Sequence, residues 1–268
     1  MTDDPGGRSE SGRLHDRLAI ARRAARAAGE LLRGVRVERV RSKSVSRDLV
    51  TEWDTHAEAK IREVLAESGL PVLGEEGGQS GSGVERWVVD PIDGTVNFAH
   101  GLPVWSISIA LEQAGEVTVG VVSAPLLGWW FEATRGGGAF DGDGNALHVS
   151  AIAELDQAML ATGFPYDLSG PDNNFADWEH MYRRAGSCRR LGCASLDLCL
   201  VARGWFDGYW ERKLGPWDVA AGALIVVEAG GTVTNLRGGP FDPHSGEALA
   251  SNGAIHGVLI NELARVRP

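Results

Sequence analysis

Two periodicities along the chain predict its helices and strands. Apolar residues at helical spacing predict helices over residues 14–32 and 51–66. Short apolar or alternating runs bounded by Gly, Pro and Asp predict strands at residues 72–73, 86–90, 106–111, 117–123, 129–133 and 138–140. Their close succession favours a mainly antiparallel sheet. The intervening Gln-Ser-Gly-Ser-Gly stretch at 79–83 predicts a flexible loop.

The second part of the chain alternates between the two patterns. Strands are predicted at 159–162, 206–210 and 248–251, and helices at 174–184, 194–202, 217–229 and 255–265. Because helices and strands mix throughout, the predicted fold class is α/β or α+β with layered sheets. We expect a disordered tail over residues 1–12 and a single domain over 13–268, with lobes of about 13–165 and 166–268.

Composition places the chain among soluble globular proteins. Of its 268 residues, 43% are hydrophobic and 23% charged. No apolar run reaches the roughly 18 residues needed to span a bilayer, and the polar start lacks the apolar segment of a signal peptide. The three cysteines, at 188, 193 and 199, are odd in number and have no Cys-x-x-Cys spacing, which argues against a zinc site or a disulfide framework. A reduced, cytoplasmic setting is expected.

The formal net charge of −10 bears on possible partners. No cluster of Lys and Arg interleaves with aromatic residues, so we expect neither nucleic-acid nor membrane binding. An acidic protein can still bind a phosphorylated metabolite where metal ions reverse the local field.

One segment, Trp-Val-Val-Asp-Pro-Ile-Asp-Gly-Thr-Val-Asn-Phe at 87–98, carries the strongest chemical signal. A predicted buried strand ends on Asp90 and Asp93, and a helix can begin at Gly94-Thr95. Carboxylates are the ligands that Mg²⁺ prefers, and the N–H groups at a helix start bind phosphate. This order of features predicts a Mg²⁺-dependent phosphatase.

Further acids stand near predicted strand ends or helix starts, at Asp54, Glu75 and Asp218. Taken singly, each could be a helix cap or a solvated turn. Five acids in one cleft would repel one another and have raised pKa values, a penalty that bound cations remove. Two ions roughly 4 Å apart can activate a water and stabilise the leaving oxygen. Thr95 has no neighbouring histidine to activate it, which argues against a covalent phosphothreonine.

The chain resembles the inositol monophosphatase family, within the Li⁺-sensitive, Mg²⁺-dependent phosphatase superfamily. The resemblance runs from about residue 40 to 231. It is carried by Lys43 with 48–54 (Asp-Leu-Val-Thr-Glu-Trp-Asp), 74–76 (Gly-Glu-Glu), 87–98, 190–195 (Arg-Leu-Gly-Cys-Ala-Ser), 217–222 (Trp-Asp-Val-Ala-Ala-Gly) and 228–231 (Glu-Ala-Gly-Gly). It implies a layered αβαβα sandwich of the inositol monophosphatase and fructose-1,6-bisphosphatase type, a homodimer, and phosphomonoester hydrolysis by direct water attack with two to three Mg²⁺ ions.

The resemblance also implies roles for residues at matching positions. The implied metal ligands are the side chains of Glu75, Asp90, Asp93 and Asp218 and the carbonyl of Ile92. Asp54 with Thr95 would polarise the nucleophilic water, and Glu75 would share in catalysis. The amides of Gly94 and Thr95 would take the phosphate, and Lys43 would lie on a mobile loop near the metals.

The leaving alcohol needs hydrogen-bond partners, for which Asp93 and Glu211 are the candidates, with Gly192 and Ala194 lining the same pocket. A carboxylate can accept from two vicinal hydroxyls, as inositol-1-phosphate would offer. Alternatively, Glu211 could be a surface acid paired with Arg212 or Lys213.

Two other functions stay open at this point. The basic, stiff segment 212–216 (Arg-Lys-Leu-Gly-Pro) and the aromatic surface of Trp205, Trp210 and Trp217 could suit a bulkier alcohol such as histidinol phosphate, whose phosphatases occur in this family. The chain could instead be a regulatory or scaffold member without activity. Degenerate scaffolds normally lose ligands, whereas every expected acid and Thr95 are present here, which favours an enzyme.

Overall fold

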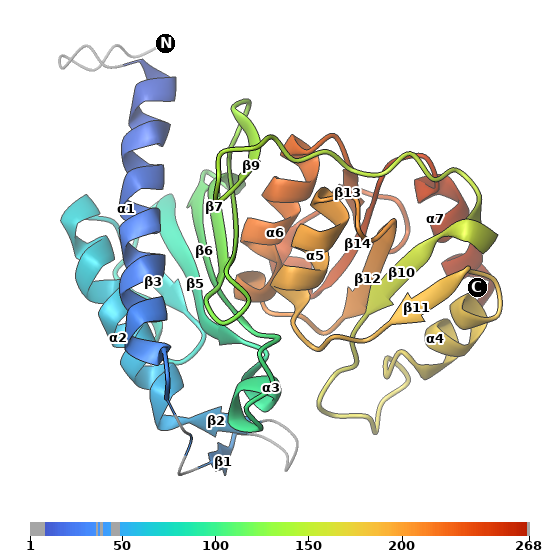
Figure 1. Cartoon of the computed structure of the whole chain (residues 1–268), viewed down its shortest axis with the longest axis horizontal. Helices are drawn as coiled ribbons and strands as arrows, with labels where there is room; N and C mark the ends of the chain where they lie inside the picture. Colours follow the sequence, from blue (N-terminus) through green and yellow to red (C-terminus); the bar gives the residue numbers. More distant parts are fainter. Residues whose placement is uncertain (1–8, 36, 38–39, 44–48, 267–268) are drawn as a thin grey trace.

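The computed structural model in Figure 1 describes residues 9–35, 37, 40–43 and 49–266. Its helices are α1 (Glu10–Leu32), α2 (Glu52–Leu65), α3 (Thr95–Ala99), α4 (Phe175–Tyr182), α5 (Ala194–Ala202), α6 (Pro216–Glu228) and α7 (His256–Val266). Its strands are β1 (Val40–Ser42), β2 (Leu49–Thr51), β3 (Val72–Gly74), β4 (Gly78–Ser80), β5 (Glu85–Asp93), β6 (Ser106–Gln113), β7 (Glu116–Ala124), β8 (Trp129–Thr134), β9 (Gly138–Asp141), β10 (Met159–Thr162), β11 (Ser187–Arg189), β12 (Gly208–Arg212), β13 (Thr232–Thr234) and β14 (Glu247–Ser251).

Five layers follow one another across the molecule (Figure 1). Helices α1 and α2 cover one face of a seven-stranded sheet of order β4-β3-β5-β6-β7-β8-β9, and α5 and α6 cover its other face. The same two helices pack against a five-stranded sheet of order β11-β10-β12-β14-β13, and α4 and α7 form the last layer. The expected αβαβα fold class is therefore confirmed.

The outer helix α1 packs closely on the large sheet because its buried face is made of small residues. Ala21, Ala24, Ala25 and Ala28 are all fully buried there. Below them lies an apolar core of sheet residues that includes Trp87 and Ile107. Burial of this face stabilises the helix far more than its intrinsic propensity does.

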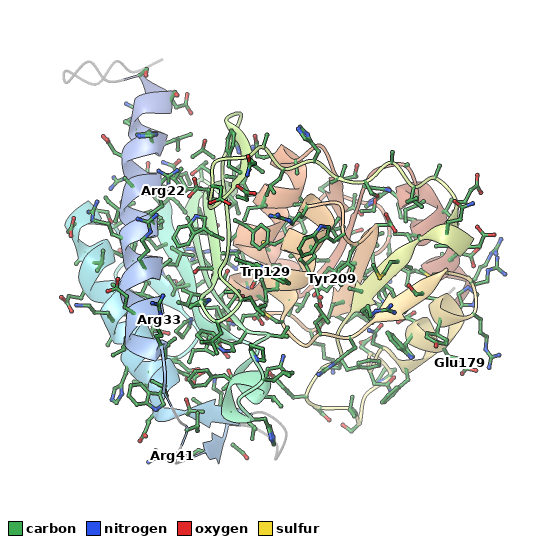
Figure 2. All side chains as sticks on the ribbon, in the orientation of Figure 1. Arg22, Arg33, Arg41, Trp129, Glu179 and Tyr209 are labelled. Carbon is green, nitrogen blue, oxygen red and sulfur yellow. The ribbon has the colours of Figure 1, made fainter. Side chains whose placement is uncertain are left out.

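The middle helices are mainly apolar, as their position between two sheets requires. All nine residues of α5 are buried, and eight of the thirteen residues of α6. Helix α6 approaches the large sheet at Gly120 of β7, where an added Cβ would lie 2.9 Å from the carbonyl oxygen of Ala221. Tyr209 lies in the interior beside these helices, whereas Glu179 of α4 projects from the outer surface (Figure 2).

The structure corrects two expectations for irregular segments. Residues 10–12, assigned to a disordered tail, form the first turn of α1, which Ser9 caps by accepting a hydrogen bond from Gly12 N–H (3.2 Å); residues 1–8 lie outside the described residues. Residues 79–80 of the expected loop belong to β4, which pairs antiparallel with β3. The hydroxyl of Ser80 holds this edge by accepting from Val72 N–H (3.2 Å) and Arg62 (3.1 Å).

The large sheet is antiparallel except where β3 pairs with β5, in agreement with the pattern analysis. The three-residue strands β1, β2, β11 and β13 were not predicted, because such short runs show no period. Among the described residues, no helix is both long and apolar enough to cross a membrane. The division into two lobes near residue 165 stays a prediction.

Candidate active site

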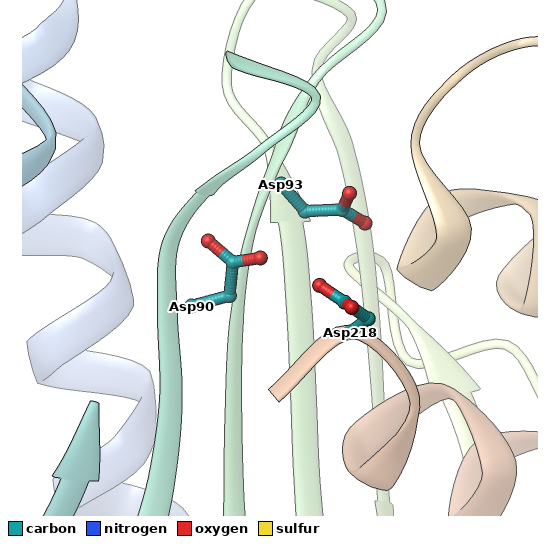
Figure 3. Close-up of side chains that lie close together, drawn as sticks. All are labelled: Asp90, Asp93 and Asp218. Atoms are coloured by element: carbon teal, nitrogen blue, oxygen red, sulfur yellow. The ribbon is translucent and has the colours of Figure 1, made fainter. Parts of the chain in front are cut away.

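Two acids that a regular strand would turn to opposite faces share one cleft at the end of β5. Asp90 pairs with Ser108 of β6, and Asp93 pairs with Ser106, so the register shifts between them. Two residues of β5 face one of β6 there, and the first of them, Pro91, has no N–H for the ladder. The irregularity brings Asp90 and Asp93 toward each other (Figure 3).

Asp218 reaches the same point from the other side of the cleft. It lies in the first turn of α6 and accepts a hydrogen bond from Gly215 N–H (2.6 Å). The hydroxyl of Ser108 on β6 donates to the carbonyl of Trp217 (2.9 Å), which ties the start of α6 to the sheet. One carboxylate oxygen each of Asp90, Asp93 and Asp218 lie within 4.8 Å of one another (Figure 3).

Asp93 is held by the beginning of α5. Its carboxylate accepts from the backbone and the hydroxyl of Ser195 (both 2.6 Å) and from Ala194 N–H (3.3 Å). The Cys193 thiol lies 3.3 Å from the same carboxylate, and Ser106 and Ser195 oxygens are 2.6 Å apart. Sequence reasoning assigned Ser195 no role of its own, although its place at a helix start was a signal for a carboxylate partner.

The turn after Asp93 requires glycine. Gly94 has φ +91°, and an added Cβ would lie 3.1 Å from the carbonyl oxygen of Gly192 and 3.2 Å from that of Val104. This turn places the start of α3, with Thr95, directly beside the acids. The backbone of 192–194 borders the same cavity, as expected for Gly192 and Ala194.

Thr95 and Asp54, predicted to act as a pair, are in contact. The Thr95 hydroxyl lies 3.0 Å from a carboxylate oxygen of Asp54 and 3.0 Å from the carbonyl oxygen of Ile92. The other Asp54 oxygen accepts from the backbone (2.8 Å) and hydroxyl (2.6 Å) of Thr51, which caps α2. Burial raises the pKa of Asp54, although the bonds from Thr51 and Thr95 lower it. Asp54 is thus both a helix cap and a partner of Thr95.

Glu75 borders Asp90 but lies outside the closest group of three acids. Lys43 binds it, with Nζ 2.8 Å from Glu75 Oε1, and also binds Glu76. Burial raises the pKa of Glu75 to about 7, and the charge of Lys43 acts against that rise. Lys43 therefore lies beside the acids and neutralises part of their charge.

Glu58 of α2 shapes the turn that carries Glu75, a role that the sequence analysis missed. Its carboxylate accepts from the backbone N–H groups of Glu76 (2.8 Å) and Gly77 (2.9 Å), and it is buried. A possible signal was its spacing of four residues from Asp54, which places both acids on one helical face.

The electrostatics of the cleft favour a cation. Burial, followed by repulsion from neighbouring acids, raises the pKa values of Asp90 and Asp218 well above the ordinary value for aspartate. The converging groups offer only oxygen atoms, which is the donor set that Mg²⁺ and other hard divalent cations prefer. Asp90, Asp93 and Asp218, which converge here, therefore supply the oxygen atoms that a hard divalent cation would need.

A cavity of about 350 Å³ extends from the acids and includes Glu211. The Tyr209 hydroxyl donates to Glu211 Oε2 (2.6 Å), and the carboxylate packs over Gly163, where a Cβ would overlap it. Burial raises the pKa of Glu211 to about 7. The alternative that Glu211 pairs with Arg212 is wrong, because Arg212 instead binds Asp177 (3.3 Å) and Glu247 (3.4 Å).

The expected aromatic surface is only partly present at the cavity. Trp217 lines it. Trp210 is fully buried on the far side of β12, where its indole N–H donates to Asn174 (2.9 Å). Trp205 packs edge-on against Trp129 and is absent from the cavity lining. Alternation along β12 explains Trp210, since its neighbours Tyr209 and Glu211 face the cavity side.

Comparisons with known proteins agree with this geometry. The model of the inositol monophosphatase family matches residues 13–267. An inositol-1-monophosphatase of Synechocystis is 42% identical over 255 residues, covering 92% of this chain and 88% of that protein. A Nus factor SuhB of Pseudomonas aeruginosa is 41% identical over 259 residues, covering 92% and 95%. The structure of an inositol monophosphatase from Anabaena superposes with a TM-score of 0.88 at 38% identity, covering 96% and 98%.

The fold and the acidic cleft define a phosphatase of the metal-dependent, layered class. Within that class, the chain belongs to the inositol monophosphatase family.

Proposed function

We propose that this protein is a Mg²⁺-dependent phosphomonoesterase that hydrolyses inositol-1-phosphate or a similar small polyol phosphate. The observation that carries the proposal is the convergence of Asp90, Asp93 and Asp218, with one oxygen of each within 4.8 Å of the others, beside the Thr95–Asp54 pair. Family membership supports the reaction class, and the acid in the adjoining cavity supports a polyol as the leaving group.

The proposed ligands of two to three Mg²⁺ ions are the side chains of Glu75, Asp90, Asp93 and Asp218 and the carbonyl of Ile92. Bound Mg²⁺ supplies Lewis-acid activation of water and neutralises charge on the phosphate. The protein's own contribution begins with the donor set, which Ser195 and the α6 N-terminus hold in position.

Thr95 and Asp54 orient the attacking water in this proposal. Since the Thr95 hydroxyl donates its proton to Asp54 or to the carbonyl of Ile92, its lone pairs remain available to accept from a water in the cleft. Asp54 is the nearest base for the proton that the water releases. Glu75 takes part as a second carboxylate on the attacking side.

The leaving alcohol would face Glu211, Asp93, Gly192 and Ala194, and the phosphate would take the amides of Gly94 and Thr95. The Glu211 carboxylate, fixed by Tyr209, can accept hydrogen bonds from two hydroxyls of a polyol. On the resemblance, we extend the proposal to a cytoplasmic homodimer that lithium inhibits.

A second candidate is a regulatory role, favoured by the relative of P. aeruginosa that carries the name of a Nus factor. The present chain keeps all the acids of the cleft, so we propose that any regulatory role accompanies catalysis and does not replace it. Histidinol phosphate remains a substrate to test, since no specific observation favours it.

The first experiment measures phosphate release from inositol-1-phosphate, histidinol phosphate, fructose-1,6-bisphosphate, NADP and 3′-phosphoadenosine 5′-phosphate, with and without Mg²⁺. We expect Mg²⁺-dependent turnover, with kcat/KM for inositol-1-phosphate at least about tenfold above the others, which corresponds to about 1.4 kcal/mol of transition-state discrimination. Asp93→Asn should lower kcat by about a thousandfold, as loss of a central electrostatic group does.

Asp143→Asn, in the exposed turn after β9, is the matched control and should retain wild-type turnover. Without Mg²⁺, Asp93→Asn should melt no lower than the wild type, because it removes a charge from the repelling group. Turnover that survives in Asp93→Asn would contradict the metal assignment. A folded wild type without activity on any ester would favour the regulatory role.

A further inference from the structure

One wall of the active-site cavity is formed by the segment between β10 and α4. This segment runs below β10 and β11 before it reaches α4 (Figure 1). Its residues 163–166 line the cavity together with the acids and Glu211. Pro165 is buried there, whereas Tyr166 is 42% exposed. The segment therefore brings a partly exposed tyrosine to the edge of the cavity.

The Tyr166 hydroxyl has no hydrogen-bond partner in the part of the chain that the structure describes. In this it differs from Tyr209, whose hydroxyl donates to Glu211 (2.6 Å). Burial, followed by the charges of Asp93 and Asp218, raises the pKa of the Tyr166 phenol. The group thus lies close enough to the acids to feel their charge. It keeps its proton, which is available for a hydrogen bond to a ligand.

Both ends of the segment are tied together by one buried side chain, that of Asn174. Its amide nitrogen donates to the hydroxyl oxygen of Thr162 (2.8 Å) and to the carbonyl oxygen of Gly163 (2.5 Å). The indole N–H of Trp210 donates to its amide oxygen (2.9 Å). Its φ of +67° is one that asparagine tolerates better than most residues. The ends of the segment therefore cannot separate without breaking buried hydrogen bonds.

The residues on both sides of the tyrosine are held as well. The ring of Phe164 lies 5.0 Å from that of Phe175 and 5.8 Å from that of Trp178, between centroids. The carboxylate of Asp167 accepts from the backbone N–H (2.9 Å) and the hydroxyl (2.7 Å) of Ser169. The backbone that carries the phenol is thus ordered in advance, which lowers the entropic cost of a contact with a ligand.

A polyol needs both kinds of hydrogen-bond partner in such a cavity. Each of its hydroxyl groups donates one proton and accepts through its oxygen, whereas an ionised Glu211 can only accept. A hydroxyl that donates to Glu211 therefore still needs a donor for its oxygen. The cations of the lining can donate, but the phenol does so without the cost of removing a charge from water. Its ring also offers apolar surface to the C–H groups of a cyclic alcohol.

We propose that Tyr166 is a specificity-determining residue for the leaving alcohol. Its hydroxyl donates a hydrogen bond to a hydroxyl oxygen of the polyol, and its ring packs against the C–H face of the same molecule. This inference rests on the proposed phosphomonoesterase activity and deepens it, since it assigns a donor that complements the acceptor Glu211. It predicts that Tyr166 distinguishes a polyol from an alcohol of similar shape without hydroxyl groups.

Inositol 1-phosphate and cyclohexyl phosphate test the proposal, because they share the ring size and differ in the ring hydroxyl groups. We measure the ratio of their kcat/KM values, inositol ester over cyclohexyl ester, in the wild type and in Tyr166→Phe. The variant should reduce the ratio at least about fivefold, which corresponds to about 1 kcal/mol. Differences in the intrinsic reactivity of the two esters cancel in this comparison. The change should lie in KM, since the contact is made before and during the reaction.

Two further measurements separate this role from a structural one. Tyr166→Phe should melt at the wild-type temperature, because the hydroxyl bonds no described residue, and it should need no more Mg²⁺ for half-maximal activity. Tyr166→Leu, which also removes the ring, should lower kcat/KM for both esters. Tyr182→Phe, at an exposed tyrosine of α4 outside the cavity lining, is the matched control and should keep the wild-type ratio.

An unchanged ratio in Tyr166→Phe, or an equal loss on both esters, would overturn the contact with the alcohol and leave the phosphatase proposal intact. A higher Mg²⁺ requirement with an unchanged ratio would do the same and would assign the hydroxyl to the acids instead. Wild-type turnover of cyclohexyl phosphate by Tyr166→Leu would contradict the packing of the ring. A wild type that hydrolyses no ester with Mg²⁺ would overturn both proposals.

Discussion

At the scale of the residue, the buried environment of Glu211 changes the pH range over which its carboxyl group titrates. Burial raises its pKa to about 7 from an ordinary 4.5. Below that pH the carboxyl is protonated and loses its capacity to accept from two hydroxyls. Ionisation of this group therefore costs stability: the cost is absent below the unfolded value near 4.5, grows as the pH rises, and is complete above about 7.

The pKa predicts a pH-dependent KM. Because the ionised fraction rises about tenfold between about pH 6 and pH 8, KM for inositol-1-phosphate should fall by about that factor over this range. The measurement is steady-state kinetics, with a small generic ester such as p-nitrophenyl phosphate as the internal reference, since protonation of the proposed metal ligands would affect both substrates.

Glu211→Gln removes the titrating group. It should raise KM for inositol-1-phosphate, abolish the pH step relative to the generic ester, and spare the generic ester itself. An equal loss on both substrates, or a pH step that persists in Glu211→Gln, would show that Glu211 does not contact the leaving group.

At the scale of the element, β12 holds both the acid and the residue that positions it. Alternation places Tyr209 and Glu211 on one side of the strand and Trp210 on the other, where Trp210 packs in a separate apolar cluster with Leu160 and Leu249. The Tyr209 hydroxyl reaches Glu211 at 2.6 Å. This hydrogen bond within β12 fixes the orientation of the Glu211 carboxylate.

Tyr209→Phe tests this positioning. Since the hydroxyl bond lowers the pKa of Glu211, its loss should move the pH step in KM to higher pH and raise KM for inositol-1-phosphate at pH 7. Loss of one hydrogen bond should cost about 1 kcal/mol of unfolding free energy. Tyr182→Phe, at an exposed tyrosine of α4, is the matched control. A lower melting temperature with an unmoved pH step would mean that Tyr209 is structural only.

At the scale of the whole molecule, the middle helices join the two sheets and complete the acidic cleft. Asp218 belongs to α6 and Asp93 is bound by the start of α5, so the layer spacing sets the distance between these acids. Helix α6 lies close to the large sheet at Gly120, where an added Cβ would be 2.9 Å from the carbonyl oxygen of Ala221. A change in this contact, far from the cleft, should therefore affect the proposed metal site.

Gly120→Ala should place a Cβ within 2.9 Å of the Ala221 carbonyl oxygen and push α6 from the sheet. We expect a loss of about 1–3 kcal/mol of unfolding free energy, as for other overpacked contacts, and a higher Mg²⁺ concentration for half-maximal activity. Thermal melts and Mg²⁺ titrations measure the two effects. Gly257→Ala in α7, where a Cβ meets open space, is the control. If Gly120→Ala is destabilised but needs no more Mg²⁺ than the wild type, the spacing of the layers does not control metal binding.

Local pattern alone predicted the long helices, most strands and the layered class, because periods of 3.6 and 2 residues are visible within a single segment. It also located the acids at 90 and 93 and the turn at Gly94, since a strand end, a glycine and a helix start are consecutive in sequence. Local pattern could not predict the three-residue strands β1, β2, β11 and β13, because only pairing with a partner strand defines them.

The sequence by itself determined the residue types of the site: oxygen ligands, a glycine turn and an acid for the alcohol. Only the tertiary structure decided how those groups are paired. The register shift in β5 turns Asp90 and Asp93 toward each other, and Ser195, from a helix a hundred residues away, holds Asp93. Arg212 is engaged by Asp177 and Glu247 rather than by its neighbour Glu211. Such partners are distant in sequence, so the layers of the fold alone bring them within hydrogen-bond distance.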